Sequence, residues 1–189
     1  MKKVVIFNGS PRYDGNTSTI LQYIERGAKE HNANVKVYNL FILKASACRG
    51  CFACRVDDLG KCSIDDDLTK AMKEMEDADA VVIGTPVYFM QMNGMTKNLY
   101  DRFFPLITNE GKPRFGEKKI VTVYTQAQDD PKMFETYFDF VSATLLPNFG
   151  FVDEHRIVCP HANNPQTAED NRDLMNEAYE LGRRLALDE

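Results

Sequence analysis

The chain has no apolar run long enough to cross a membrane, and its first segment, residues 1–7, holds two lysines and then four apolar residues. A bilayer-spanning helix needs about 20 apolar residues, and the core of a signal peptide needs about 7 to 15. The sequence therefore predicts a cytoplasmic protein with no membrane contact. Because thiols are kept reduced in the cytoplasm, we do not expect the five cysteines to form a disulfide framework.

Basic charge is also scarce. The sequence has 23 Lys and Arg against 28 Asp and Glu, a net charge of -5 that is spread along the chain. A nucleic-acid-binding protein would need a basic face, which this distribution does not provide. The chain also lacks internal repeats, low-complexity tracts and linker-like stretches, so we expect residues 1–189 to form one domain.

Several catalytic and nucleotide-binding motifs are missing as well. There is no GxGxxG fingerprint and no Gly-Lys-Ser/Thr loop, which disfavours a dinucleotide or nucleoside triphosphate at the first glycine-rich loop. No Ser/His/Asp set or paired carboxylates can be recognised either. The protein would therefore need another source of chemistry, such as a bound cofactor.

What the chain does have is a regular alternation of apolar runs and amphipathic stretches. Continuous or alternating apolar patterns predict strands at residues 3–8, 35–40, 80–84, 118–124 and 151–158. Helical spacing predicts helices from Thr17 and over residues 65–75, 94–103, 134–146 and 167–187. This order predicts an α/β fold, a doubly wound five-stranded parallel sheet with helices on both faces. Ligands in such sheets bind at the carboxyl ends of the strands, here the loops that begin at Gly9, Thr85 and Thr125.

The first of these loops, residues 9–17, suits an anion. Glycines at positions 9 and 15 let the backbone turn tightly and approach a ligand. Side-chain donors surround them: Ser10, Arg12, Asn16, Thr17 and Ser18. A helix that starts near Thr17 adds free N–H groups and the positive end of its dipole. A simple helix cap with a turn would explain single residues but not the whole set, so a terminal monophosphate is the favoured ligand.

The most specific spacing in the chain is Cys48-x2-Cys51-x2-Cys54-x7-Cys62. Four thiolates this close in a loop can hold a cubane iron–sulfur cluster, whereas structural zinc sites usually have two pairs separated by a longer span. The neighbouring cations Arg49, Arg55 and Lys61 would offset the charge of a cluster, but they could equally lower the pKa of one reactive thiol. Cluster, redox-active thiols and bystander cysteines all stay open at this point. Cys159 has no partner in sequence and is expected to be a small buried residue.

The stretch Gly-Ser-Pro-Arg-x-x-Gly-Asn-Thr at residues 9–17 resembles the FMN phosphate loop of the NAD(P)H-dependent FMN reductase and iron–sulfur flavoprotein group, whose members are flavodoxin-like. The resemblance extends over residues 84–94 and includes Lys97, Asp101 and Arg102, and residues 48–67 resemble the cysteine motif of iron–sulfur flavoproteins that bind [4Fe-4S]. It implies the strand order 2-1-3-4-5 and a bound FMN. The expected contacts of the flavin ring are Pro86, Val87, Tyr88, Phe89 and Met90 in the second loop and Thr125 and Gln126 in the third. An aromatic and methionine cluster of this kind is more often core, although we expect the strand before it to end at Pro86.

These features predict an FMN-dependent NAD(P)H oxidoreductase that passes electrons to a flavin, a quinone, another small acceptor or a redox protein. The alternative is an iron–sulfur flavoprotein that carries electrons without turning over pyridine nucleotides. A homodimer or higher homo-oligomer is also expected, because residues 90–104 hold more apolar side chains than one helix face needs.

Overall fold

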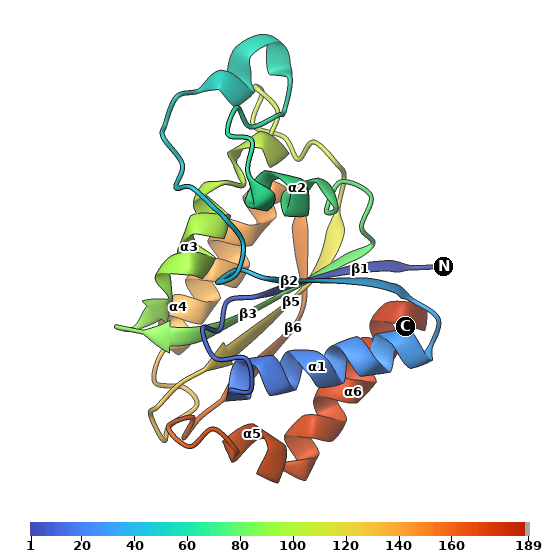
Figure 1. The fold of residues 1–189 in the computed structure, drawn as a ribbon, viewed down its shortest axis with the longest axis vertical. Helices are drawn as coiled ribbons and strands as arrows, with labels where there is room; N and C mark the ends of the chain where they lie inside the picture. The colour runs from blue at the N-terminus through green and yellow to red at the C-terminus, as the bar shows by residue number, and fades with distance from the viewer. Residues whose placement is uncertain (188–189) are drawn as a thin grey trace.

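The computed structural model describes residues 1–187, which form a twisted sheet covered by helices on both faces (Figure 1). The parallel strands lie in the order β2-β1-β3-β5-β6. Their bounds are Lys3–Asn8 for β1, Asn34–Asn39 for β2, Ala80–Tyr88 for β3, Lys118–Thr125 for β5 and Phe151–Cys159 for β6. A short strand, β4 (Gln91–Met92), pairs antiparallel with the end of β3. The predicted fold class and strand order are confirmed, with β4 as an addition.

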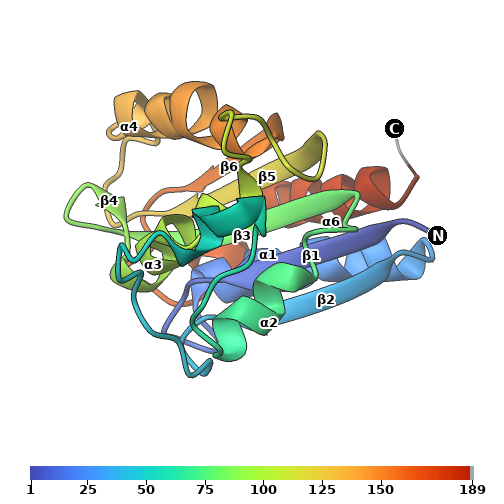
Figure 2. The same ribbon diagram turned by 90° about the horizontal axis from the view of Figure 1, so that it is seen from above.

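Two helical layers bury the two faces of the sheet, as Figure 2 shows from above. On one side lie α1 (Asn16–Glu30), α5 (Thr167–Asp170) and α6 (Arg172–Leu187). On the other side lie α2 (Asp67–Lys73), α3 (Gly94–Asp101) and α4 (Glu135–Phe140). Alternate residues of β1 enter opposite layers: Val4 and Ile6 pack towards α1 and α6, while Val5 and Phe7 pack towards α2 and α3. This double burial is why the strand reads as a continuous apolar run.

Three predicted boundaries were wrong. The helix expected over residues 134–146 stays α-helical only to Phe140 and continues as a π-helix (Val141–Leu145) and a 3-10 helix (Leu146–Phe149). The closing helix is divided between α5 and α6, because Asn171 adopts an extended backbone conformation. The strand expected to end at Pro86 runs on to Tyr88, because Pro86 still pairs with Thr125 and the last residues of β3 pair with β4.

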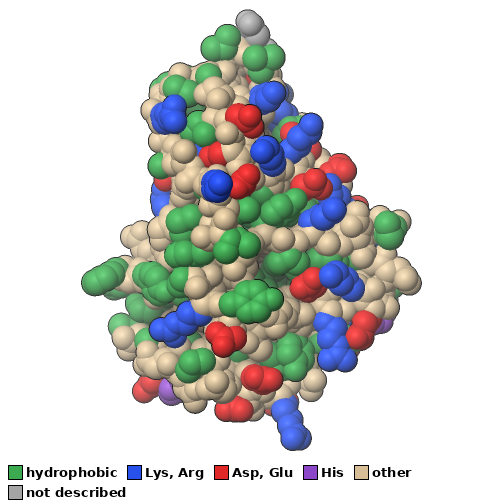
Figure 3. All heavy atoms as spheres, viewed as in Figure 1, with side chains coloured by type: hydrophobic (Ala, Val, Ile, Leu, Met, Phe, Trp, Pro, Cys, Tyr) green, Lys and Arg blue, Asp and Glu red, His purple; other side chains and the backbone are tan. Residues whose placement is uncertain are grey.

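The cysteine-rich segment forms a lobe at the top of the molecule as seen in Figure 1, between β2 and α2. It contains a short 3-10 helix, Ala53–Asp58, which contacts a second one, Phe104–Leu106. Basic and acidic side chains lie intermixed on the face seen in Figure 3. Within residues 1–187, no helix combines the length and the apolar character that a membrane crossing requires.

Candidate functional site

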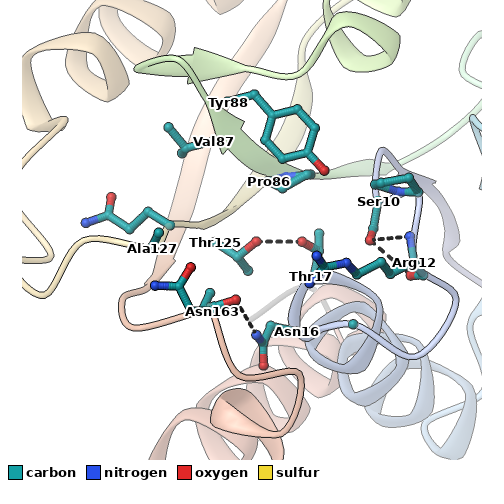
Figure 4. Close-up of a pocket in the computed structure, with 14 residues that line it drawn as sticks. Ser10, Arg12, Asn16, Thr17, Pro86, Val87, Tyr88, Thr125, Ala127 and Asn163 are labelled. Atoms are coloured by element: carbon teal, nitrogen blue, oxygen red, sulfur yellow. Dashed lines mark hydrogen bonds between the residues drawn. The ribbon is translucent and has the colours of Figure 1, made fainter.

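A pocket of about 150 Å³ opens at the carboxyl ends of β1, β3 and β5 (Figure 4). The three loops that the sequence predicted as ligand-binding line it, together with the loop after β6. Nine of the sequence-predicted residues are among its walls: Ser10, Arg12, Asn16, Thr17, Pro86, Val87, Tyr88, Thr125 and Gln126. Ala162 and Asn163, from the loop after β6, also line it and were not expected. The topology therefore gathers the predicted loops at one place, as the carboxyl ends of neighbouring parallel strands must.

The first turn of α1 faces this pocket without a side-chain cap. Gly15 is the N-cap residue, and no side chain accepts a hydrogen bond from the first turn. The alternative of a simple side-chain cap at this helix start, by Asn16 or Thr17, is therefore wrong. Uncapped N–H groups together with the positive end of a 15-residue helix dipole form a site suited to an anion. Arg12, which is exposed, adds a positive charge at the rim.

The first loop is held in shape by its own polar side chains. The Ser10 hydroxyl donates to the carbonyl of Arg12 at 3.0 Å and accepts from the Arg12 N–H at 3.1 Å. The Ser18 hydroxyl donates to the same carbonyl at 2.7 Å and accepts from the amide of Asn8 at 2.9 Å. Ser18 is buried and does not line the pocket. Asn8 was not recognised from the sequence, where it was the last residue of an apolar run.

Two further contacts tie the first loop to its neighbours. The hydroxyls of Thr17 and Thr125 lie 2.7 Å apart, which joins the first loop to the end of β5. The Asn16 amide donates to the carbonyls of Ala162 and Asn164, and its oxygen accepts from the N–H of Ala168. The Asn16 side chain therefore fixes the loop after β6, and only its backbone N–H is left for a ligand.

The β3–β4 hairpin forms the opposite wall of the pocket. Pro86, Val87 and Tyr88 line it, but Phe89 and Met90 do not. These two residues form the two-residue turn of the hairpin, with φ of 46° and 71°, and their side chains are exposed. The turn is of the type in which both central residues have positive φ, a conformation that favours Asn and Gly. Of the expected aromatic and methionine side chains in this loop, Tyr88 therefore lines the pocket, together with the smaller apolar residues Pro86 and Val87.

Hydrogen bonds hold the third wall of the pocket, the loop after β5, in place. Gln126 is buried, and its amide donates to the carbonyl of Asp130 at 2.6 Å. Its backbone N–H donates to the carbonyl of Cys159 at 2.9 Å. Burial raises the pKa of the Cys159 thiol to about 11, in agreement with the small buried residue expected at that position.

A second, apolar cavity of about 160 Å³ lies at the base of the lobe, and all four clustered cysteines line it: Cys48, Cys51, Cys54 and Cys62. Among the described residues, no three His, Cys, Asp or Glu side chains come together closely enough to hold a metal ion. The thiols therefore share one cavity wall but are not gathered around one point. A set of four sulfur donors in an apolar cavity is nonetheless the donor chemistry that an iron–sulfur cluster uses.

The thiols of this cavity differ in character. Hydrogen bonds from the Ser63 hydroxyl, 3.4 Å away, and from the Ala53 N–H lower the pKa of Cys51. Burial raises the pKa of Cys54. Cys51 is also exposed, so it is the most reactive of the thiols whose pKa is shifted.

The lobe is fixed to the rest of the fold by arginines. The Arg55 guanidinium lies 3.7 Å from the Phe104 ring centroid and donates to the carbonyls of Ile107 and Thr108. Arg114 pairs with Asp58. Arg55 thus anchors the lobe, and although burial raises the pKa of Cys54, the Arg55 charge lowers it by a smaller amount.

Residues 2–131 match the family described as NADPH-dependent FMN reductase. Among curated proteins, an iron-sulfur flavoprotein of Archaeoglobus fulgidus is 39% identical over 100 residues, which cover 53% of this chain and 48% of that protein. An iron-sulfur flavoprotein of Methanocaldococcus jannaschii is 35% identical over 104 residues, covering 55% and 53%. The chain spans about half the length of these curated relatives.

Solved structures agree on the fold. The NAD(P)H:quinone oxidoreductase from Methanothermobacter marburgensis superposes with a TM-score of 0.73 at 14% identity, covering 97% of this chain and 96% of that one. An FMN-dependent NADH-azoreductase from Bacillus anthracis, solved in complex with FMN, gives a TM-score of 0.72 at 14% identity, covering 98% and 100%. At such low identity these likenesses establish the architecture alone.

Proposed function

Because the chain belongs to the NADPH-dependent FMN reductase family, we propose that it binds FMN and oxidises NADH or NADPH, passing the electrons to a small molecule or a redox protein. The observation that carries this proposal is the pocket at the ends of β1, β3 and β5, where an uncapped helix start meets two hydroxyl-bearing loops. Bound FMN would supply the hydride and electron chemistry.

The residues of this chain would position the flavin. The N–H groups of the first turn of α1, the Thr17 hydroxyl and the Arg12 guanidinium would hold the phosphate. Tyr88 and the backbone of Pro86 and Val87 would lie along the ring. The pocket is not closed off from the surface, so a nicotinamide or an acceptor would reach the ring from its open part.

Binding of FMN and riboflavin to matched variants tests the phosphate site. We expect Arg12→Gln to weaken FMN binding about tenfold, because one charge-assisted hydrogen bond is lost. Riboflavin lacks the phosphate, so its affinity should not change. Lys36→Gln removes the same charge from an exposed position on β2 and should leave both affinities alone. Equal losses for FMN and riboflavin in Arg12→Gln would place Arg12 outside a phosphate site.

The reductase activity is tested by mixing the FMN-loaded protein with NADH or NADPH in a stopped-flow instrument without oxygen. Loss of the flavin absorbance at a rate typical of enzyme turnover, about 1 per second or faster, supports the reductase activity. If neither nucleotide bleaches the flavin, the reductase proposal fails.

A second candidate is an iron–sulfur flavoprotein that carries electrons without pyridine nucleotides. The specific observation in its favour is that four cysteines line one apolar cavity, and matched relatives carry the name iron-sulfur flavoprotein. The cysteines would hold a [4Fe-4S] cluster. Iron and acid-labile sulfide analysis of anaerobically purified protein, with a visible spectrum, decides whether the cluster is present.

We also propose a homodimer that covers the β3–β4 hairpin. The reason differs from the one given by the sequence, because Met92, Tyr100 and Phe103 turn out to be core residues. The most exposed apolar side chains in and beside that segment are Phe89 and Met90 at the hairpin tip beside the pocket, and Phe104 is exposed to a smaller extent. A monomer by light scattering, with FMN bound, would remove this proposal.

A further inference from the structure

Arg102 is a buried cation at the base of the cysteine lobe, directly after the last residue of α3. Its side chain is 0% exposed. Burying an unpaired guanidinium would cost several kcal/mol, so its partners are informative. One terminal nitrogen, Nη1, donates to the carbonyl of Ser46 at 2.7 Å and to Asp66 at 2.9 Å. The other, Nη2, donates to Asp66 at 3.1 Å and to the Thr69 hydroxyl.

These bonds join the two ends of the lobe. Ser46 lies just before the first cysteine of the motif, and Asp66 lies just after the last. Asp66 also accepts from the Ser46 N–H at 2.9 Å. Arg102 and Asp66 together therefore close the loop that carries the four thiols. This accounts for the terminal nitrogens of the guanidinium but not for its third donor.

The third donor, Nε, is buried and has no hydrogen-bond partner among the described residues. Arg102 lines the cavity with the four cysteines, and Cys62 is the thiol that interacts with it. Burial lowers the pKa of Arg102, but Asp66 and Cys62 together raise it further than burial lowers it. Buried donors without partners are rare and costly, so this N–H is expected to have an acceptor in the functional protein.

Few other charges face this cavity. Of the residues that line it, only Arg49, Asp101 and Arg102 are charged. Arg49 is exposed, and Asp101 is half exposed and pairs with Lys97. Charges in contact with water are screened, whereas a fully buried guanidinium is screened much less. Arg102 is thus the fully buried charged group among the residues that line this cavity, whereas Arg55, whose charge also acts on Cys54, is held by Phe104 and two carbonyls outside the lining.

We propose that Arg102 is a positioning residue for the cysteine site, donating its Nε–H to the Cys62 sulfur and thereby raising the reduction potential of the iron–sulfur cluster that the four thiols would hold. The inference rests on the second proposed function. Reduction adds negative charge to the cluster, and hydrogen bonds and positive charge at the sulfurs stabilise the reduced form more than the oxidised form.

The test is a redox titration of anaerobically purified protein that carries both cofactors, followed by electron paramagnetic resonance of the reduced cluster. For Arg102→Gln we expect the equilibrium constant for cluster reduction to fall about tenfold, which is about 59 mV for one electron. Arg102→Lys keeps the charge, so its equilibrium constant for cluster reduction should fall less. The matched control, Arg49→Gln, removes the same charge from the exposed rim of the same cavity and should shift the potential much less than Arg102→Gln.

The outcomes separate this inference from the proposed function. Absence of iron and sulfide in the wild-type protein overturns the cluster and this inference together. A cluster whose potential is unchanged in Arg102→Gln, or is shifted as much in Arg49→Gln, overturns this inference alone.

A second measurement covers the case in which the Arg102 variants do not assemble the cluster. Arg49→Gln protein labelled with arginine that carries 15N only in its guanidinium group is reduced, and its electron spin echo modulation is recorded. A weak 15N coupling to the cluster supports the hydrogen bond from Arg102, and the absence of any coupling overturns it.

Discussion

Replacing Asp66 by asparagine is expected to lower the free energy of unfolding by about 3 kcal/mol, because it leaves the buried Arg102 guanidinium without its counter-charge. The Asp66 side chain is only 10% exposed. Its two oxygens accept four hydrogen bonds, two from Arg102 and one each from the N–H groups of Ser46 and Thr69. Asparagine keeps the shape and one acceptor oxygen, so the loss reflects mainly the missing charge and the bonds that its second oxygen made.

The pH dependence follows from the same contacts. Burial raises the pKa of Asp66, but the hydrogen bonds from Arg102, Ser46 and Thr69 lower it by more than burial raises it. The resulting pKa lies far below the ordinary value of an aspartate. A carboxyl whose pKa is lowered by folding contributes its stability above the unfolded pKa, about 3.9, and loses it as the pH falls towards the folded pKa. The wild-type protein should therefore exceed Asp66→Asn in stability by a constant amount from pH 7 to pH 5. Below pH 4 this difference should shrink.

Urea unfolding followed by circular dichroism at several pH values measures this difference. With a slope of about 2 kcal/mol/M, a loss of 3 kcal/mol moves the midpoint by about 1.5 M. Asp65→Asn is the matched control, because Asp65 is exposed and has no hydrogen-bond partner in the described structure. A difference under about 1 kcal/mol at pH 7, or one that widens as the pH falls, would refute the reasoning.

Two further predictions concern packing and the hairpin. Gly27→Ala should destabilise the protein by about 2 kcal/mol in urea unfolding, because the new Cβ would lie 2.0 Å from the main-chain oxygen of Tyr179 in α6; Gly94→Ala, with no atom within 4 Å, should be nearly neutral, and equal losses would contradict this packing argument. Phe89→Asn combined with Met90→Gly should raise the unfolding free energy of the monomer by about 1 kcal/mol, because both positions have positive φ; a loss of stability at a concentration where the chain is monomeric would show that the native side chains support the hairpin.

The order and direction of the main strands were predictable because burial leaves a strong local signal. Both faces of β1 are covered, so residues 3–8 show an apolar run that no turn residue interrupts. The breaks in the helices were not predictable in the same way. The π-helix that follows Phe140 and the extended residue at Asn171 come without a proline or glycine at the break. Pro86 had the opposite effect, because it predicted an end of the strand that the structure does not have. A proline removes one hydrogen-bond donor from a strand without ending it.

Most residues that line the pocket were predicted by type, but what each side chain can do depends on partners that are distant in sequence. Asn16 was expected to be a ligand donor, yet its amide binds backbone groups 146 and 148 residues away. Arg55 was expected to act on the thiols, and its charge does oppose the rise that burial causes in the pKa of Cys54, but its guanidinium also donates to carbonyls 52 and 53 residues away. Local composition indicates that polar groups are present in a loop, whereas the tertiary fold decides which of them remain free. Of the groups near the proposed phosphate site, the backbone N–H donors are the ones least visible in a sequence.

Helix α3 shows how the fold places the pocket and the cysteine cavity relative to each other. At its start, the Asn93 side chain accepts from the Thr96 N–H at 3.0 Å and donates to the carbonyl of Gly9 in the first loop. At its end, Arg102 fastens both ends of the cysteine lobe. Eight helical residues span about 12 Å, so one rigid element sets the separation of these two anchors. The lobe can therefore change in length or sequence between Ser46 and Asp66 without moving the first loop, because the contacts that hold that loop are made at the other end of the helix.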